Sequence, residues 1–230
     1  LNDEEKEAGV VLVDIGGGTT DVAIFHEGVI RHTAVIPFGG NVITDDIKEG
    51  CTILRRHAEA LKVKFGSALA SESLETEVVC IPGLRGRDPK EITLRNLASI
   101  IQARMEEIIE HVHYEIVNSG YEKKMIAGIV VTGGGSQLKH ITQLFEYMTG
   151  MTTRIGLPTE HLASTNTIDA ITSPMYATGI GLVMKGFENE VPQKQVESVI
   201  GQVKGHSTKT RGSFFDTLLT KSKNFFAEEE

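Results

Sequence analysis

The chain has 230 residues, of which 40% are hydrophobic and 23% are charged, and its formal net charge at pH 7 is −8. Such values are typical of a soluble globular protein with one large or two small domains. The negative charge argues against a nucleic-acid scaffold, because most of the surface would repel a polyanion.

Cysteine content and apolar runs argue against a disulfide-bonded, membrane-spanning or secreted protein. Cys51 and Cys80 are too far apart for a C-x-x-C pair and indicate free thiols in a reducing cytosol. No apolar run approaches membrane-spanning length, and the polar start is unlike a signal peptide. Because the chain opens at Leu1 and a predicted strand follows almost at once, we expect a piece of a longer protein.

Strand and helix patterns alternate along the chain and predict an α/β fold. Short apolar runs that end at turn residues predict strands at 10–15, 20–26, 29–37, 77–81 and 126–132. Glu27 and Gly28 predict a hairpin turn, and the stretch from 82 to 88 predicts a turn-rich tip. Capping residues at 44–46 predict the start of a helix, and helical spacing predicts helices at 53–66, 93–118 and 139–148. The stretch 173–184 is expected to be helical at its end.

Two glycine clusters each follow an apolar strand. They comprise residues 16–18, after the first strand, and residues 133–135, after the strand at 126–132. Glycine lets backbone N–H groups approach an anion closely, and consecutive N–H groups form an anion-binding concavity. We also expect the second cluster to open a helix, where the positive end of the dipole favours phosphate. Two such units favour a nucleotide held between two turns, although no G-x-x-x-x-G-K-[ST] loop occurs.

A carboxylate, Asp14, stands at the end of the first strand, beside the first glycine cluster. A hard oxygen ligand next to a phosphate cradle is what a hydrated magnesium ion requires. Thr19 and Thr20 add hydroxyl donors for phosphate oxygens. The alternative is that Asp14 caps the turn and Asp21 only polarises the next strand, and spacing alone leaves both interpretations open.

Several motifs carry a resemblance to a known superfamily. The run D-I-G-G-G-T-T-D at 14–21 resembles the second phosphate motif of the actin and heat-shock-chaperone ATPases, and V-V-T-G-G-G-S at 130–136 resembles their adenosine motif. Between them, A-E-A-L-K at 58–62, followed by Phe65 and Gly66, is similar to their ribose- and adenine-contacting helix. The run P-M-Y-A-T-G-I-G-L-V at 174–183 looks like the closing hinge helix of the FtsA family of bacterial cell-division proteins.

The resemblance implies an α/β fold, an actin-like ATPase (ribonuclease H-like) domain with an inserted α+β subdomain. The implied parts are a nucleotide-binding core at 1–50 and 121–187, the inserted subdomain at 51–120, a linker at 188–212, and an amphipathic membrane-targeting helix with an acidic tail at 213–230. ATP and Mg²⁺ are the implied ligands, with Asp14 holding magnesium through water.

The resemblance also assigns nucleotide contacts residue by residue. The phosphates would be bound by Gly16, Gly17, Gly18 and Thr19. The ribose or base would be reached by Glu59 and Lys62. The α-phosphate and adenosine would lie along Gly133, Gly134, Gly135 and Ser136. For Glu59 and Lys62 the alternative is a solvated helix face with an i,i+3 ion pair.

One departure from the superfamily pattern concerns catalysis. The superfamily needs another D-x-G turn, on the opposite domain, to enclose the β- and γ-phosphates, and this sequence has only the one at Asp14. Phosphoryl transfer depends on positioning and charge stabilisation from both sides of the cleft. We therefore expect one wall of an ATP cleft, no catalytic residue in this chain and at most a weak ATPase.

The last segment has the pattern of an amphipathic helix after a polar linker. Too short to span a membrane, it would lie in the interface through apolar residues at helical spacing: Phe214, Phe215, Leu218, Leu219, Phe225 and Phe226. Burying each apolar side chain would gain about 1.5–3 kcal/mol. Ordering each residue of the segment would cost about 1–2 kcal/mol in conformational entropy, so a single copy should bind weakly. Polymerisation would join many weak anchors into a strong one. The alternative is a terminal helix that docks on a protein groove.

The resemblance to FtsA also implies partners and a location. The expected partners are the C-terminal tail of the tubulin-like protein FtsZ, further copies of the chain in a polymer, other divisome proteins and the cytoplasmic face of the cell membrane at the division site. The candidate surface for the FtsZ tail is Lys90, Arg95, Asn96 and Arg104, for which an exposed charged helix face is the alternative. Other functional interpretations are a sugar-kinase-like or chaperone-like ATPase of the same superfamily, and a glycine-turned α/β domain without nucleotide.

Overall fold

The computed structural model describes residues 1–82, 88–159 and 171–187. The chain divides into two compact units, Leu1–Met184 and Lys185–Glu230. Only residues 185–187 of the second unit are described. The expected linker at 188–212, the amphipathic segment at 213–230 with its six apolar residues, and most of the turn-rich tip therefore lie outside the described residues.

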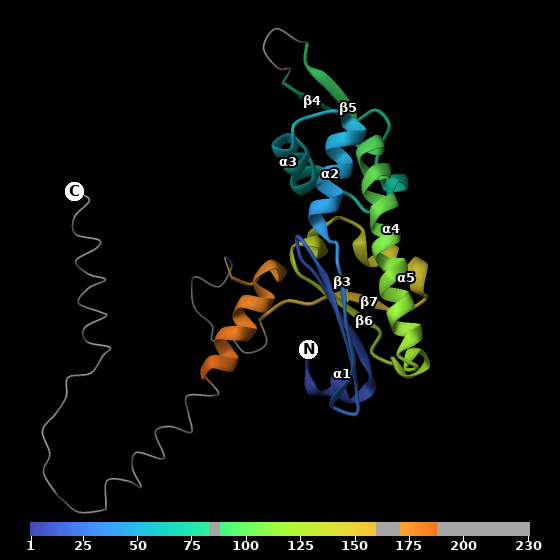
Figure 1. Ribbon diagram of the computed structural model, residues 1–230. Helices are drawn as coiled ribbons and strands as arrows, with labels where there is room; N and C mark the ends of the chain where they lie inside the picture. The colour runs from blue at the N-terminus through green and yellow to red at the C-terminus, as the bar shows by residue number, and fades with distance from the viewer. Residues whose placement is uncertain (83–87, 160–170, 188–230) are drawn as a thin grey trace, which may run out of the picture. The chain divides into compact units, whose positions relative to one another are not determined.

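A five-stranded mixed sheet with the order β3-β2-β1-β6-β7 forms the centre of the first unit (Figure 1). β1 (Val10–Ile15), β2 (Thr20–His26) and β3 (Val29–Ile36) are antiparallel neighbours, whereas β6 (Ile129–Thr132) and β7 (Thr153–Ile155) continue the sheet in parallel with β1. The strands predicted at 10–15 and 20–26 are confirmed. β1 is the central strand, and Val11, Val13 and Ile15 on one of its faces are fully buried, whereas Leu12 and Asp14 on the other face are half-buried.

A two-residue hairpin joins β2 to β3. Glu27 and Gly28 both have positive φ, 56° and 73°, as a type I′ turn requires. Arg31 donates a hydrogen bond back to the Glu27 carboxylate and ties the turn to β3. The predicted hairpin is therefore confirmed.

Two helices pack against the sheet. α4 (Leu94–Asn118) contacts β2 and β3, and α5 (Ile141–Thr149) contacts β7 and α4. α4 begins at Thr93, whose side chain accepts a hydrogen bond from the Asn96 N–H. The predicted apolar stripe of α4 is buried at Leu97, Ile101, Met105, Ile108, Val112 and Ile116, and it joins the strand residues in one hydrophobic core.

Beyond the sheet, α2 (Gly40–Cys51) and α3 (Arg55–Phe65) pack on α4 (Figure 1). A two-stranded sheet of β4 (Val78–Ile81) and β5 (Lys90–Thr93) lies at this end of the molecule. Most of these elements fall in the range 51–120 expected for an inserted subdomain, whose boundaries stay a prediction.

The structure differs from the sequence-based expectation at several element ends. α2 starts at Gly40 and not at 44–46, because the N–H groups of Gly40 and Asn41 donate to Gly16 O and Gly17 O at 2.9 and 2.8 Å and need no side-chain cap. β6 starts three residues later than expected, since Ile126 is 83% exposed. The sequence does not predict β5 and β7, because strands of four and three residues carry too little periodicity.

The remaining elements are short. α1 (Asp3–Ala8) starts with a capping box between Asn2 and Glu5. Single 3₁₀ turns occur at η1 (Ala70–Glu72), η2 (Glu122–Lys124), η3 (Gly134–Gln137) and η5 (Pro174–Tyr176), and residues 177–187 are helical. Among the helices in the described ranges, none has both the length and the apolar character needed to cross a bilayer.

Candidate functional site

The parallel pairing of β1 with β6 brings the two glycine clusters to the same edge of the sheet. Asp14 of β1 stands opposite Thr132 of β6 in the register, so both chain segments leave the sheet side by side. We call residues 16–19 the first loop and residues 133–136 the second loop. The two loops lie next to each other because each follows one of two paired strands, β1 and β6.

The first loop is fixed to the start of α2. The Gly16 N–H donates to Thr19 O at 2.9 Å and closes the loop, while the carbonyls of residues 16 and 17 accept hydrogen bonds from the first turn of α2. Gly39 has no room for a side chain, since a Cβ there would lie 2.5 Å from Gly16 O. The close approach of helix and loop therefore requires glycine at position 39.

The second loop folds against the end of β1. Gly133 has φ of 83°, and a Cβ there would lie 2.2 Å from Asp14 Oδ1. Ser136 is buried, and its Oγ donates to Gly133 O at 2.8 Å. At Gly134, in contrast, a Cβ would meet no atom within 4 Å. The loop thus combines one position that only glycine can fill with one that faces open space.

The second loop does not open the helix that the sequence predicts there. It leads into η3, a single 3₁₀ turn of four residues, and α5 starts only at Ile141. The expected contribution of an α-helix dipole at this loop is therefore wrong, because the summed dipole needs a longer run of aligned peptides. An anion would meet the N–H groups of a tight turn instead.

Glu59 and Lys62 of α3 form a polar cluster with Thr44 of α2. Lys62 Nζ lies 2.9 Å from Glu59 Oε2, 2.7 Å from Thr44 Oγ1 and 2.8 Å from Gly40 O. The Thr44 hydroxyl also hydrogen-bonds to Glu59 Oε2. The i,i+3 ion pair of the alternative interpretation is present, with the Lys62 side chain 13% and the Glu59 side chain 48% exposed.

The polar cluster favours the ionised form of Glu59. Burial opposes ionisation of this carboxyl, but hydrogen bonds from Thr44 and Lys62, together with the positive charges of Lys62 and Arg55, outweigh burial and lower its pKa. Glu59 is therefore a carboxylate at neutral pH, and a carboxylate only accepts hydrogen bonds. A ligand hydroxyl is a suitable donor.

A cavity of about 440 Å³ lies between the two loops, α2 and α3. Its volume is within the range of about 300–1,000 Å³ typical of small-molecule sites. The expected contacts that line it are Gly16, Gly17, Glu59, Lys62, Gly134 and Gly135. The structure thus brings six of the expected residues to one space, whereas Gly18, Thr19, Gly133 and Ser136 lie in the loops but outside the lining.

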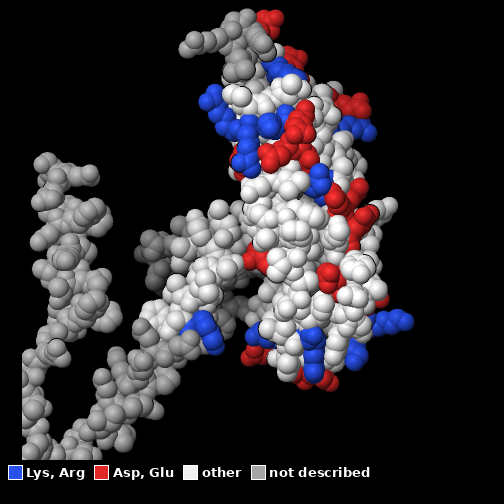
Figure 2. Space-filling model, viewed as in Figure 1, with Lys and Arg blue, Asp and Glu red and all other residues white. Residues whose placement is uncertain are grey.

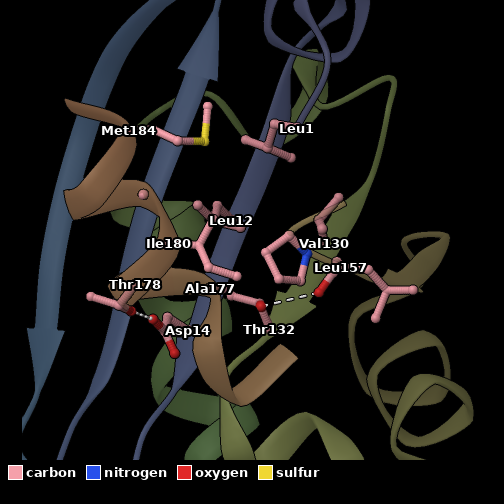
Figure 3. A pocket seen from close by; sticks show the side chains of 13 residues that line it. Leu1, Leu12, Asp14, Val130, Thr132, Leu157, Ala177, Thr178, Ile180 and Met184 are labelled. Carbon is pink, nitrogen blue, oxygen red and sulfur yellow. Dashed lines mark hydrogen bonds between the residues drawn. The ribbon is translucent and has the colours of Figure 1, made fainter. Parts of the chain in front are cut away.

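Asp14 faces a different cavity, of about 260 Å³ (Figure 3). Its Oδ2 accepts a hydrogen bond from Thr178 Oγ1 at 2.6 Å. Figure 3 shows the apolar side chains of Leu12, Ile180 and Met184 around the same space. The carboxylate is therefore next to the first loop in sequence but turned away from the cavity that both loops line.

Asp14 also stands directly opposite Asp21 in the β1–β2 register. Carboxylates in this position repel each other, and the hydroxyls of Thr178 and Thr19 reduce the repulsion by donating to Asp14 and Asp21 respectively. Within the described ranges, no group of three or more His, Cys, Asp or Glu side chains could hold a metal ion. A hydrated magnesium ion needs only one or two carboxylates beside phosphates, so Asp14 suits it in kind, while its carboxylate faces the 260 Å³ cavity and not the space between the two loops.

Arg104, one of the four residues expected at a partner surface, is engaged inside the protein. Its Nε and Nη2 donate to the two carboxylate oxygens of Asp46 on α2 at 2.6 and 3.0 Å, and Nη1 donates to Glu107. Hydrogen bonding to Asp46 outweighs burial and raises the pKa of the guanidinium. Arg104 therefore holds α4 against α2.

The other three expected residues are exposed. Arg95 forms an ion pair with Glu75, Asn96 faces solvent, and Lys90 lines a groove of about 620 Å³ beside the ends of α2 and α3. Figure 2 shows basic and acidic side chains interspersed over this end of the molecule. The arrangement is a mixed charged surface beside a groove, with no large area of one sign in this view.

Sequence reasoning missed two side chains on which the site depends. Thr44, expected as a helix cap, is 1% exposed and hydrogen-bonds to residues 15 and 18 positions away. Thr178 meets Asp14 across 164 positions. Hydrophobic patterns and motif spacing in the sequence do not indicate contacts between side chains that are so far apart along the chain.

Comparison with known proteins identifies the family. The family model described as "Cell division protein FtsA" matches residues 11–181. The chain belongs to the FtsA family. It is 41% identical to the cell division protein FtsA of Pseudomonas aeruginosa over 207 residues, which is 90% of this chain and 48% of that protein. The corresponding protein of Escherichia coli K12 is 36% identical over 213 residues, 87% of this chain and 50% of that protein. The chain thus spans about half the length of these curated FtsA relatives.

Solved structures confirm the actin-like α/β fold expected from the two glycine motifs. MreB5 of Spiroplasma citri bound to AMPPNP has a TM-score of 0.65 at 24% identity, over 86% of this chain and 57% of that one. The PilM–PilN type IV pilus biogenesis complex has a TM-score of 0.60 at 16% identity, over 80% of this chain and 47% of that one. At such identities the likeness concerns the fold alone.

Alanine at the two neighbouring glycines of the second loop should affect stability very differently. Gly133→Ala should lower the free energy of unfolding by about 1–3 kcal/mol, because alanine is strained at positive φ and its Cβ would collide with β1. Gly134→Ala, the matched control, should stay within about 0.5 kcal/mol of the unchanged chain. Urea unfolding measures both, and equal midpoints for the two variants would contradict the geometry.

The lowered pKa of Glu59 predicts a pH dependence. A carboxyl with a lower pKa in the folded than in the unfolded state stabilises the fold above its unfolded pKa, and this contribution is lost as the pH falls through the folded pKa. Below about pH 4.5, the unchanged chain should therefore lose stability more steeply than Glu59→Gln. Glu5 also has a lowered pKa and adds the same pH dependence to both proteins, so the test is the difference between their free energies of unfolding at each pH. Parallel curves in urea unfolding from about pH 7 to about pH 3 would show that Glu59 makes no such contribution.

Proposed function

We propose that the chain forms one wall of an ATP-binding cleft in an actin-like cell-division protein. The observation that carries this proposal is the cavity that both glycine loops share with Glu59 and Lys62. Each feature alone is compatible with a glycine-turned domain that binds no nucleotide. Their convergence favours a ligand that carries phosphates at one end and a sugar at the other.

Each part of the nucleotide is proposed to contact a different part of the cavity. N–H groups of the first loop would bind phosphates, those of the second loop would follow the α-phosphate and adenosine, and α3 would face the ribose. Solved MreB5 structures of the same fold, one bound to AMPPNP and one to ADP, support a nucleotide as the ligand.

Asp14 is the residue that we propose for magnesium, through a bound water. The ion would supply charge neutralisation for the phosphates. The Thr178 hydroxyl donates to the same carboxylate, which faces the 260 Å³ cavity. Asp14 therefore has to exchange or share this hydrogen bond when it holds a hydrated ion.

Catalysis requires more than this wall. Phosphoryl transfer needs charge stabilisation from both sides of the cleft, and the sequence has a single D-x-G turn. We therefore infer that the chain alone hydrolyses little or no ATP.

We propose the C-terminal tail of FtsZ as the partner of the inserted subdomain at 51–120. The support is a groove beside Lys90 whose lining combines apolar residues, among them Ile53, Leu54 and Ile81, with charges of both signs, and Arg95 and Asn96 are exposed nearby in sequence. Arg104 would have to leave Asp46 to contact such a peptide, so we assign it to helix packing instead.

Membrane tethering and polymerisation complete the proposed function. The sequence of residues 213–230 predicts an amphipathic segment, which a sugar kinase has no use for, and membership of the FtsA family favours cell division over the sugar-kinase-like and chaperone-like alternatives. One copy of the segment would bind the cytoplasmic face of the membrane weakly. A polymer that presents many copies would bind it firmly.

Calorimetric titration with MgATP tests the cleft. The unchanged chain should bind, and Gly134→Ala should bind about tenfold more weakly, because its methyl group projects into the space of the ligand without disturbing the fold. Gly179→Ala is the matched control, since that glycine also has open space around it but lies outside the cavity lining. Absence of binding to the unchanged chain, or equal affinity in all three proteins, would overturn the proposal.

Sedimentation with liposomes tests the tether. The chain should sediment with vesicles that contain anionic lipid, whereas a chain truncated after Thr210 should stay in the supernatant. The double variant Phe214→Glu, Leu218→Glu should behave like the truncated chain, because it removes apolar area without shortening the sequence. Equal binding by the full and truncated chains would refute membrane tethering by this segment.

A further inference from the structure

The segment that follows α3 lies beside the segment that follows the second loop. The Ala68 N–H donates to Lys139 O at 2.8 Å, and the Lys139 N–H donates to Gly66 O at 3.3 Å, so Ser67 and Lys139 form an isolated parallel bridge. Residues of α3 and of the second loop line the 440 Å³ cavity from two sides. The bridge therefore joins these two sides through residues 66–68 and 139, which do not line the cavity themselves.

Leu138 connects the bridge to the cavity. It stands between the second loop and the bridge in sequence, and its side chain lines the cavity. The same side chain packs on the end of α3, where a Cβ at Gly66 would lie 2.8 Å from Leu138 Cδ2. The placement of Leu138 therefore depends on how closely residues 66–68 approach residues 138–140.

His140, which follows the bridge, has a backbone conformation that residues other than glycine rarely adopt. Its φ and ψ are 61° and 17°, in the left-handed region. In the described ranges the other non-glycine residues with positive φ are Glu27, in the hairpin turn, and Thr52, at the end of α2. His140 differs from both because its ring is bonded to a segment 73 positions away. Strain of this kind persists where the surrounding contacts hold it.

The hydroxyl of Ser67 holds the ring of His140. Ser67 is 3% exposed, and its Oγ lies 3.0 Å from His140 Nδ1. The same Oγ donates to Leu69 O at 2.9 Å and accepts from the Leu69 N–H at 3.2 Å. A hydroxyl has one hydrogen, which Leu69 O receives, so the hydrogen of the third contact is assigned by this count to His140 Nδ1. The three contacts then use the donor and both acceptor positions of the hydroxyl.

We propose that Ser67 and His140 are positioning residues that fix the separation between α3 and the second loop and thereby place Leu138 against the nucleoside end of a bound nucleotide. The inference rests on the proposed ATP site. Neither Ser67 nor His140 lines the cavity, so neither would touch the ligand. Their hydrogen bond holds His140 in the left-handed conformation, which directs the chain from the bridge into α5.

Calorimetric titration with MgATP tests the pair. Ser67→Ala and His140→Gly should each weaken binding about fivefold, because each removes the hydrogen bond, while glycine keeps the left-handed backbone without strain. The double variant should bind no more weakly than either single variant, since all three lack the same contact. Unchanged affinity in the single variants, or losses that multiply to about 25-fold in the double variant, would overturn the proposal.

A conservative variant separates positioning from a simple loss of packing. In His140→Asn the amide nitrogen takes the place of Nδ1 as a donor, and asparagine tolerates the left-handed conformation, so binding should stay within about twofold of the unchanged chain. Ser99→Ala is the matched control for Ser67→Ala, because the Ser99 hydroxyl donates to Arg95 O inside its own helix, α4. Affinity in His140→Asn as low as in His140→Gly would overturn the role of the hydrogen bond.

Amide hydrogen exchange of the chain without nucleotide gives a readout that is independent of the ATP site. The amides of Ala68 and Lys139 should exchange about fivefold faster in Ser67→Ala than in the unchanged chain or in Ser99→Ala, while the amides of β2 keep their rates. Unchanged exchange at both amides would overturn the positioning role. Faster exchange, with no binding of MgATP by the unchanged chain, would leave the role of Ser67 at the bridge standing and refute the ATP site.

Discussion

Backbone hydrogen bonds between β1 and β6 hold together two segments that are far apart in the sequence, and the candidate site is built outward from this pairing. The register sets Asp14 against Thr132, so the two glycine loops leave the sheet at one edge. Gly133 then packs on the end of β1, and Gly39 lets α2 approach the first loop. A register shift would separate the loops and remove the cavity between them, whatever the loops' own sequences.

Beside the paired strands, the site also depends on the polar cluster of Lys62, Glu59 and Thr44. Thr44 is buried and Lys62 is 13% exposed, so leaving either of them without its partners in this cluster would be costly, whereas Glu59 is half exposed. The cluster joins α3 to the first turn of α2, and α2 in turn is joined to the first loop. Backbone and side-chain hydrogen bonds thus form one continuous connection from α3 to the edge of the sheet.

Local patterns in the sequence predict the parts of the fold that local physics determines. β1 and β2 follow from runs that end at glycine or at a hairpin turn, and the buried stripe of α4 follows from its spacing. The actin-like fold was expected from a family resemblance carried by the two glycine motifs together with the runs at 58–62 and 174–183. Of the candidate site, the sequence predicts which residues line the cavity between the loops better than it predicts how they are held.

The features that the sequence does not predict depend on contacts between distant segments. α2 starts early because carbonyls of the first loop satisfy its N–H groups, and no capping side chain records this. Thr44 has the sequence signature of a cap but is buried inside the cluster. Asp14 has the position of a metal-organising residue, yet in this structure Thr178 turns its carboxylate toward another cavity. In each case a tertiary contact outweighs the local preference.

The placement of α2 has a mechanical consequence. At one end the helix is bonded to the first loop, and at the other end Lys48 and Glu49 line the groove beside Lys90. Its 12 residues make a rod about 18 Å long, since a helix rises about 1.5 Å per residue. The same helix therefore forms part of both the cavity between the glycine loops and the rim of the groove, so a substitution that moved α2 along its axis would change both.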